Sequence, residues 1–139
     1  MRKIRRYRLQ CIVIVVGFLA VFSVVSNVNA FRSIASRSNG VTVDVKPTQF
    51  AAGKPTKFEV SMNTHSVDLS ADLTVVSTLM DAQGKDYRPV SWEGDGPGGH
   101  HRSGVLEFPA LEGTAKSVTL VIRDIAKVPE RVFQWDLEK

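Results

Sequence analysis

Three histidines are the side chains best suited to chemistry in this sequence, and they lie in two short segments. His65 lies in THSVDL, and His100 and His101 stand side by side in GGHHRSGVLEFP. Imidazole is the commonest ligand for transition metals in proteins. We therefore take the three histidines as candidate ligands for copper or zinc, with Asp68 as a candidate companion carboxylate.

The alternation of side chains along a strand decides which histidines could share an ion. Successive side chains of a strand point to opposite faces of the sheet, so His100 and His101 cannot both bind one ion in an extended segment. Met62 and Leu106 are apolar and are expected to face the core, so the odd-numbered His65 and His101 on the same strands should face outward. They are the expected pair, and His100 replaces His101 if a β-bulge inverts the parity.

A structural interpretation of the same segments stays open. The glycines at positions 94, 96, 98 and 99 let the chain adopt positive φ in a tight loop. The histidines would then bond to loop carbonyls, and Trp92, Asp95 and Arg102 would support the loop. In this interpretation Arg102 pairs with Asp68 or Asp95, and no ion is involved.

The first thirty residues have the features of an export signal. Basic residues precede the apolar run at 12–25, and Val28 and Ala30 occupy the positions that a signal peptidase recognises. A membrane span needs about twenty apolar residues, more than this run offers. We predict cleavage after Ala30 in preference to a retained N-terminal anchor. The protein is then periplasmic or extracellular, and it contacts the membrane only if this segment is retained.

Charge and cysteine content exclude several classes of function. Of the 18 Lys and Arg, five precede Ala30, so the remaining 13 nearly balance the 14 Asp and Glu, and a nucleic-acid partner has no support. The single cysteine, Cys11, precedes the apolar run, which leaves the mature chain without a disulfide, a thiol nucleophile or a cysteine-ligated metal site. No nucleophile and base form a recognisable local motif, and we expect no enzymatic activity.

The elements that must position the histidines are short strands. Residues 31–40 are polar and without periodicity, and we expect a flexible tether there. Beyond them apolar residues alternate in seven runs, at 41–45, 58–62, 73–79, 87–92, 106–108, 118–122 and 133–137. Residues 125–130 could form at most one helical turn. Seven short strands separated by turn signals predict an all-β, immunoglobulin-like β-sandwich over residues 41–139.

Three strings of the chain resemble a family of small exported bacterial all-β domains of unknown activity. They are THSVDL (64–69), GGHHRSGVLEFP (98–109) and VIRDIAKVPERVFQWDL (121–137). The resemblance implies that the two histidine strings belong together, and it supplies no ligand. In architecture the chain is also similar to periplasmic copper-resistance β-sandwiches of the CopC type. Those proteins tend to use an N-terminal histidine, whereas this mature chain would begin at Phe31.

Two functions follow from these observations. The first is an extracytoplasmic protein that binds copper or zinc through His65 and His101. The second is a non-catalytic structural or interaction module, in which the histidine loop shapes a surface for an extracytoplasmic protein partner.

Overall fold

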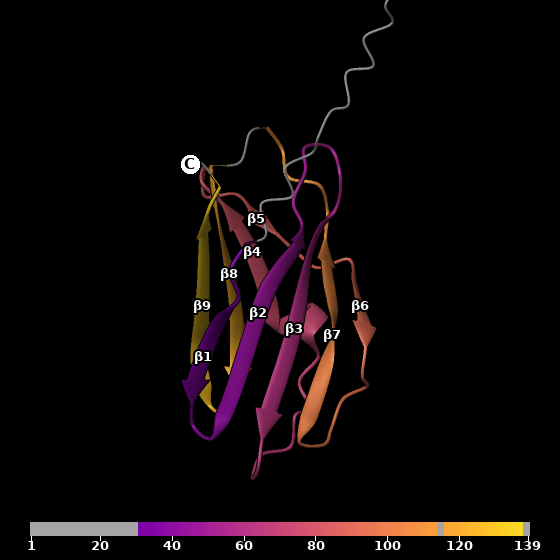
Figure 1. Ribbon diagram of the computed structural model, residues 1–139, viewed down its shortest axis with the longest axis vertical. Coiled ribbons are helices and arrows are strands. Elements are labelled where there is room, and N and C mark those ends of the chain that lie inside the picture. The colour runs from indigo at the N-terminus through magenta and orange to yellow at the C-terminus, as the bar shows by residue number, and fades with distance from the viewer. Residues whose placement is uncertain (1–30, 114–115, 138–139) are drawn as a thin grey trace, which may run out of the picture.

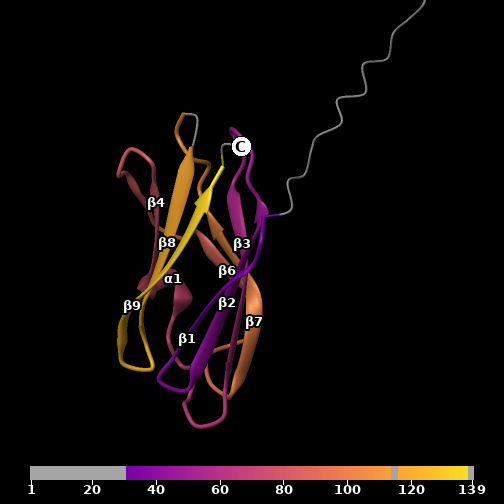
Figure 2. The same cartoon turned by 60° about the vertical axis from the view of Figure 1, so that its left-hand side comes forward.

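Alternating apolar side chains build two antiparallel sheets that pack face to face (Figures 1 and 2). The structure is a computed structural model and describes residues 31–113 and 116–137. The predicted export signal, residues 1–30, lies outside the described residues. Within the described part of the chain, no helix has the length and apolar character needed to cross a membrane.

The strands are distributed five and four between the sheets. The first sheet holds, in spatial order, β1 (Ile34–Ser38), β2 (Val41–Gln49), β3 (Thr56–Thr64), β7 (His101–Phe108) and β6 (Ser91–Gly94). The second holds β5 (Asp86–Tyr87), β4 (Ser77–Asp81), β8 (Ser117–Ile125) and β9 (Val128–Asp136).

The order of the strands confirms the predicted immunoglobulin-like sandwich. Without β1 and β5, the sequence β2-β3-β7-β6 opposes β4-β8-β9, which is the four-plus-three arrangement of an immunoglobulin constant domain. The inward side chains form one core, in which Phe58 packs edge-on against Phe108 and also contacts Trp135. Trp135 is buried, whereas Trp92 is half-buried at the margin of this core.

The prediction of a flexible tether at 31–40 is wrong, because this segment contains β1. The strand pairs with β2 from Ile34 opposite Val45 to Ser38 opposite Val41. Both residues of the connecting turn, Asn39 and Gly40, have positive φ (48° and 74°), as a two-residue hairpin turn requires. Polar composition concealed the strand, because β1 lies at the edge of its sheet and buries little apolar surface.

A buried arginine holds this edge strand in place. Arg131 is 2% exposed and occupies an inward position of β9. Its Nη1 donates to the Ser36 carbonyl (3.2 Å), and its Nη2 donates to the carbonyls of Ser38 (2.9 Å) and Ile125 (3.4 Å). Burial lowers the pKa of the guanidinium below its ordinary value. These bonds tie the β1–β2 hairpin to the second sheet.

One local prediction also differs from the structure. The expected strand at 73–79 begins as one helical turn, α1 (Leu73–Val76), because the Asp72 carboxylate accepts hydrogen bonds from the backbone and hydroxyl of Thr74 (2.9 and 2.7 Å). The segment 125–130, which by its sequence could form at most one helical turn, forms the tight β8–β9 hairpin. Ala126 and Lys127 adopt positive φ there (57° and 60°).

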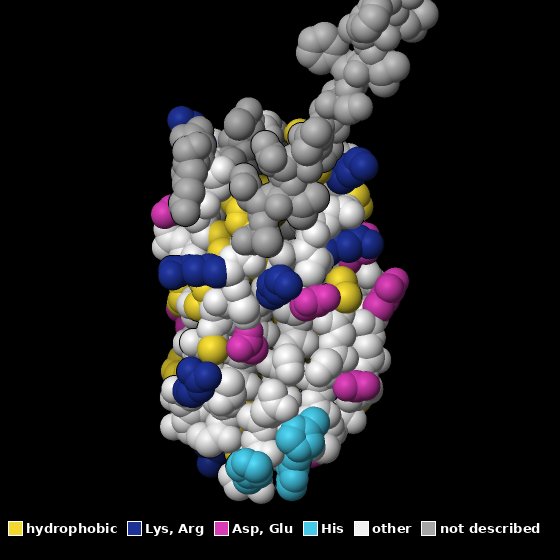
Figure 3. Space-filling model, viewed as in Figure 1, with side chains coloured by type: hydrophobic (Ala, Val, Ile, Leu, Met, Phe, Trp, Pro, Cys, Tyr) yellow, Lys and Arg dark blue, Asp and Glu magenta, His cyan; other side chains and the backbone are white. Residues whose placement is uncertain are grey.

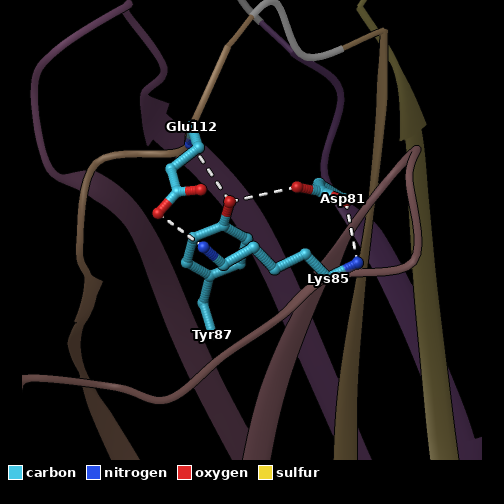
Figure 4. A network of polar contacts seen from close by, with 4 residues as sticks. All are labelled: Asp81, Lys85, Tyr87 and Glu112. Carbon is cyan, nitrogen blue, oxygen red and sulfur yellow. Dashed lines mark hydrogen bonds and ion pairs between the residues drawn. The ribbon is translucent and has the colours of Figure 1, made fainter.

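A polar network around Asp81 fastens loops at the end of the sandwich near β5 (Figure 4). The buried Asp81 carboxylate accepts hydrogen bonds from the backbone N–H groups of Gln83 and Lys85 (both 2.9 Å) and from the Tyr87 hydroxyl (3.0 Å). The Tyr87 hydroxyl accepts from the Glu112 backbone (3.1 Å). Burial raises the pKa of Asp81, but the hydrogen bonds outweigh burial and hold the pKa below its ordinary value of 3.8.

Replacing Asp81 should therefore weaken the fold in a pH-dependent way. A carboxyl whose pKa is lower in the folded state stabilises the fold above its unfolded pKa, and this stabilisation is lost as the pH falls through the folded pKa. We expect Asp81→Asn to lower the Tm at neutral pH by roughly 5–10 °C, because the amide nitrogen cannot accept a hydrogen bond. The difference from wild type should shrink below the unfolded pKa, as calorimetry from pH 7 to pH 2 would measure.

The matched control is Asp86→Asn, at an exposed position of β5. This variant should keep the wild-type Tm at neutral pH. Equal losses of Tm in the two variants would contradict the structural role of the Asp81 network.

Candidate metal-binding rim

The two histidine segments lie side by side at one end of the sandwich. The backbone N–H of Thr64 donates to the His100 carbonyl (3.0 Å), and that of Leu69 donates to the Gly99 carbonyl (3.1 Å). The backbone N–H of Gly98 donates to the Leu69 carbonyl (2.9 Å). We call residues 63–69 and 98–101 the histidine rim. Figure 3 shows the histidine side chains gathered at this end of the molecule.

The ring of His101 is oriented by Asn63, its partner in the β3–β7 register. The Asn63 amide nitrogen donates to the Ser61 hydroxyl (3.3 Å), which directs its Oδ1 toward His101. This oxygen lies 2.8 Å from His101 Nδ1 and can only accept a hydrogen bond, so a hydrogen bond here requires the tautomer with its proton on Nδ1. The lone pair of the neutral ring is therefore on Nε2.

The other two histidines are exposed on the same rim. The pairing of β3 with β7 is regular from Thr56 opposite Phe108 to Asn63 opposite His101, without the bulge that would favour His100. His65 follows directly after the end of β3, and the Thr64–His100 bond extends the ladder beside it. His65 itself lies in a bend beyond this ladder, where Thr64 Oγ1 accepts hydrogen bonds from the backbone N–H groups of Ser66 and Val67 (both 3.2 Å).

Asp68 stabilises the loop by a hydrogen bond to the backbone of Gly99. Its Oδ1 accepts from the backbone N–H of Gly99 (2.9 Å) and so fixes one half of the rim against the other. Over residues 31–113 and 116–137, no group of three or more His, Cys, Asp or Glu side chains is arranged to hold a metal ion. At most two of the candidates His65, Asp68, His100 and His101 could therefore share one ion.

Arg102 connects the rim to the loops behind it. It is 3% exposed, and its Nη1 donates to the carbonyls of Leu69 (3.1 Å) and Ala71 (2.5 Å). Its Nε donates to the Asp95 carbonyl (3.2 Å), and the guanidinium lies 5.5 Å from the centre of the Trp92 ring. The predicted ion pair of Arg102 with Asp68 or Asp95 is wrong, because the guanidinium donates to backbone carbonyls and not to a carboxylate.

The other hydrogen bonds that hold this loop join residues close together in the sequence. The Trp92 indole N–H also donates to the Asp95 carbonyl (2.9 Å), and the Asp95 carboxylate accepts from the Ser103 backbone (2.8 Å). Trp92, Asp95 and Arg102 thus lie together, as expected for a supporting cluster.

Hydrogen bonds from Thr74, with a smaller contribution from the charge of Arg102, hold the pKa of the Asp72 carboxyl below its ordinary value.

Two features of the glycines explain why the loop needs them. Gly98 and Gly99 adopt positive φ (106° and 75°), a conformation that side chains disfavour. A Cβ at Gly94 would lie 2.3 Å from the Ser103 carbonyl oxygen, because β6 and β7 approach closely there. The loop therefore has a structural basis for its composition, independent of any ligand.

A shallow groove of about 560 Å³ crosses the outer face of the first sheet and reaches the rim at Asn63. Short polar side chains, including Ser61 and Ser103, line the groove at this end. Asp44, Lys46 and Glu59 lie among its other lining residues. Asn63 therefore belongs both to this groove and to the contact that orients His101. Sequence reasoning missed Asn63, although its outward parity on β3 is the same as that of His65.

Comparisons with known proteins were made against families, curated proteins and solved structures. No family profile and no curated protein matches the chain. Among solved structures, the chain is similar to a DUF4426 family protein from Pseudomonas aeruginosa PAO1, with 15% sequence identity and a TM-score of 0.48. The match covers 77% of this chain and 94% of that one.

Removing the Arg102 guanidinium should loosen the rim. We expect Arg102→Met to lower the free energy of unfolding by about 3 kcal/mol, because three backbone carbonyls lose their donor. Chemical denaturation would measure this loss, and the amides of Leu69, Gly98 and Gly99 should exchange faster with deuterium. The control is Arg37→Met, at an exposed position of β1, which should change neither quantity. Unchanged exchange in Arg102→Met would contradict the role given to this side chain.

Proposed function

We propose that this protein is an exported, non-catalytic binding protein that holds a transition-metal ion at the histidine rim through His101 and His65. The observation that carries the proposal is the hydrogen bond from His101 Nδ1 to Asn63 Oδ1 (2.8 Å). Histidines that bind metals almost always donate their other ring N–H to an oxygen, which fixes the tautomer and aims the lone pair. The Asn63–His101 pair has this arrangement before any ion is bound.

The donor set favours copper(II), with zinc(II) second. Imidazole nitrogen suits both ions, and a given set of nitrogen ligands binds copper(II) more tightly than zinc(II). Both candidate imidazoles are exposed, so an ion can reach them without a change in the fold. Open coordination positions would remain for water or for a further ligand.

A second candidate function rests on the contacts behind the rim. Arg102 and Asp68 order the loop without any ion, which is the property that a preformed protein-binding surface needs. In this case the rim presents its imidazoles to an extracytoplasmic protein partner. We then expect His65→Ala to change partner binding, while added metal leaves the Tm unchanged.

Titration with copper(II), with protein lacking a polyhistidine tag, tests the proposed function. We expect the double variant His65→Gln/His101→Gln to lose copper(II) binding by calorimetry. Asn63→Ala should weaken binding about tenfold or more, because it frees the ring of His101 without removing it. His100→Gln is the matched control, because it removes an imidazole of opposite parity, and it should bind as wild type does.

Thermal stability supplies an independent readout. A metal that binds only the folded protein raises the Tm in proportion to the logarithm of its concentration. Wild-type protein should show this rise, and the double variant should not. Equal copper(II) binding by wild type and the double variant would refute the proposal.

A further inference from the structure

We propose that a metal ion at the histidine rim joins two copies of this chain, each of which supplies His65 and His101. The inference rests on the proposed function and adds the partner that completes the site. The interface is then a two-fold contact between two rims, and the bridging ion lies on the axis between them.

The number of ligands on one rim favours an ion shared by two copies. Zinc in closed protein sites is four-coordinate and tetrahedral, with nitrogen, sulfur or oxygen ligands. One rim offers the pair His65 and His101, and Nε2 of His101 with one ring nitrogen of His65 can fill two positions. A second copy offers the same pair in the same geometry, so that four imidazoles close the coordination sphere.

The shape of the rim also favours contact with a second copy. The residues beside the imidazoles have short side chains: Asn63, Ser66, Gly99 and Ser103 are all exposed. The histidines consequently stand out from their surroundings, and Figure 3 shows them at the extremity of the molecule. Protruding imidazoles on a convex end can meet their counterparts on another copy before other side chains collide.

The charge of the rim segments does not oppose this contact. The rim segments, 63–69 and 98–101, contain no Lys or Arg and one acid, Asp68. The carboxylate of Asp68 is engaged with the Gly99 backbone. Within these two segments, no Lys or Arg side chain opposes the approach of a cation. The nearly neutral mature domain adds little repulsion between the copies.

Sedimentation velocity with zinc(II) tests the inference. In EDTA the protein should sediment as a monomer, and half an equivalent of zinc(II) should convert it to a dimer. A large excess of zinc(II) should restore the monomer, because each rim then binds its own ion. His101→Gln should remain monomeric at every zinc(II) concentration, and the control variant His100→Gln should dimerise as wild type does.

The outcomes separate this inference from the proposed function. Zinc(II) binding at one ion per chain, with monomers throughout, overturns the bridged pair and leaves the metal site intact. Absence of any zinc(II) or copper(II) binding overturns both. A zinc-dependent dimer that persists in His65→Gln/His101→Gln also overturns the inference, because another surface then makes the contact.

Discussion

The buried guanidinium of Arg102 is the interaction on which the histidine rim depends. A charge removed from water is costly unless hydrogen bonds replace its hydration, and Arg102 finds three backbone carbonyls and the face of Trp92. These carbonyls belong to the loops on both sides of the rim. Because Arg102 follows His101 directly on β7, the same contacts also fix the strand that carries the imidazole. The rim is therefore ordered before it meets a ligand.

Arginine binding to backbone carbonyls recurs at a second place in the sandwich. Arg131 joins the β1–β2 hairpin to β9 much as Arg102 joins the loops at 69–71 and 95 to β7. The domain after Cys11 has no cysteine, so it cannot use the disulfide that many exported sandwiches use to link their sheets. Two buried guanidiniums and the Asp81 network tie its loops and sheets together instead.

The period-two pattern was sufficient to predict the sandwich and the outward direction of His101, because alternation along a strand depends only on local geometry. The partners of those residues could not be predicted in the same way. Asn63 meets His101 through the register of β3 with β7, and Arg102 meets carbonyls more than thirty positions away. Strand β1 was missed for a related reason, because its partners are β2 and Arg131, and Arg131 is more than ninety positions away in the chain.

The tautomer and metal response of the His101 ring test the central claim most directly. Long-range ¹H–¹⁵N spectroscopy of the imidazoles reports which ring nitrogen carries the proton and which one binds zinc(II). The account predicts a proton on Nδ1 of neutral His101, and a zinc(II)-induced shift at Nε2 of His101 together with a shift on the ring of His65, with His100 unchanged. A proton on Nε2 of neutral His101, or rings that do not respond to zinc(II), would contradict it.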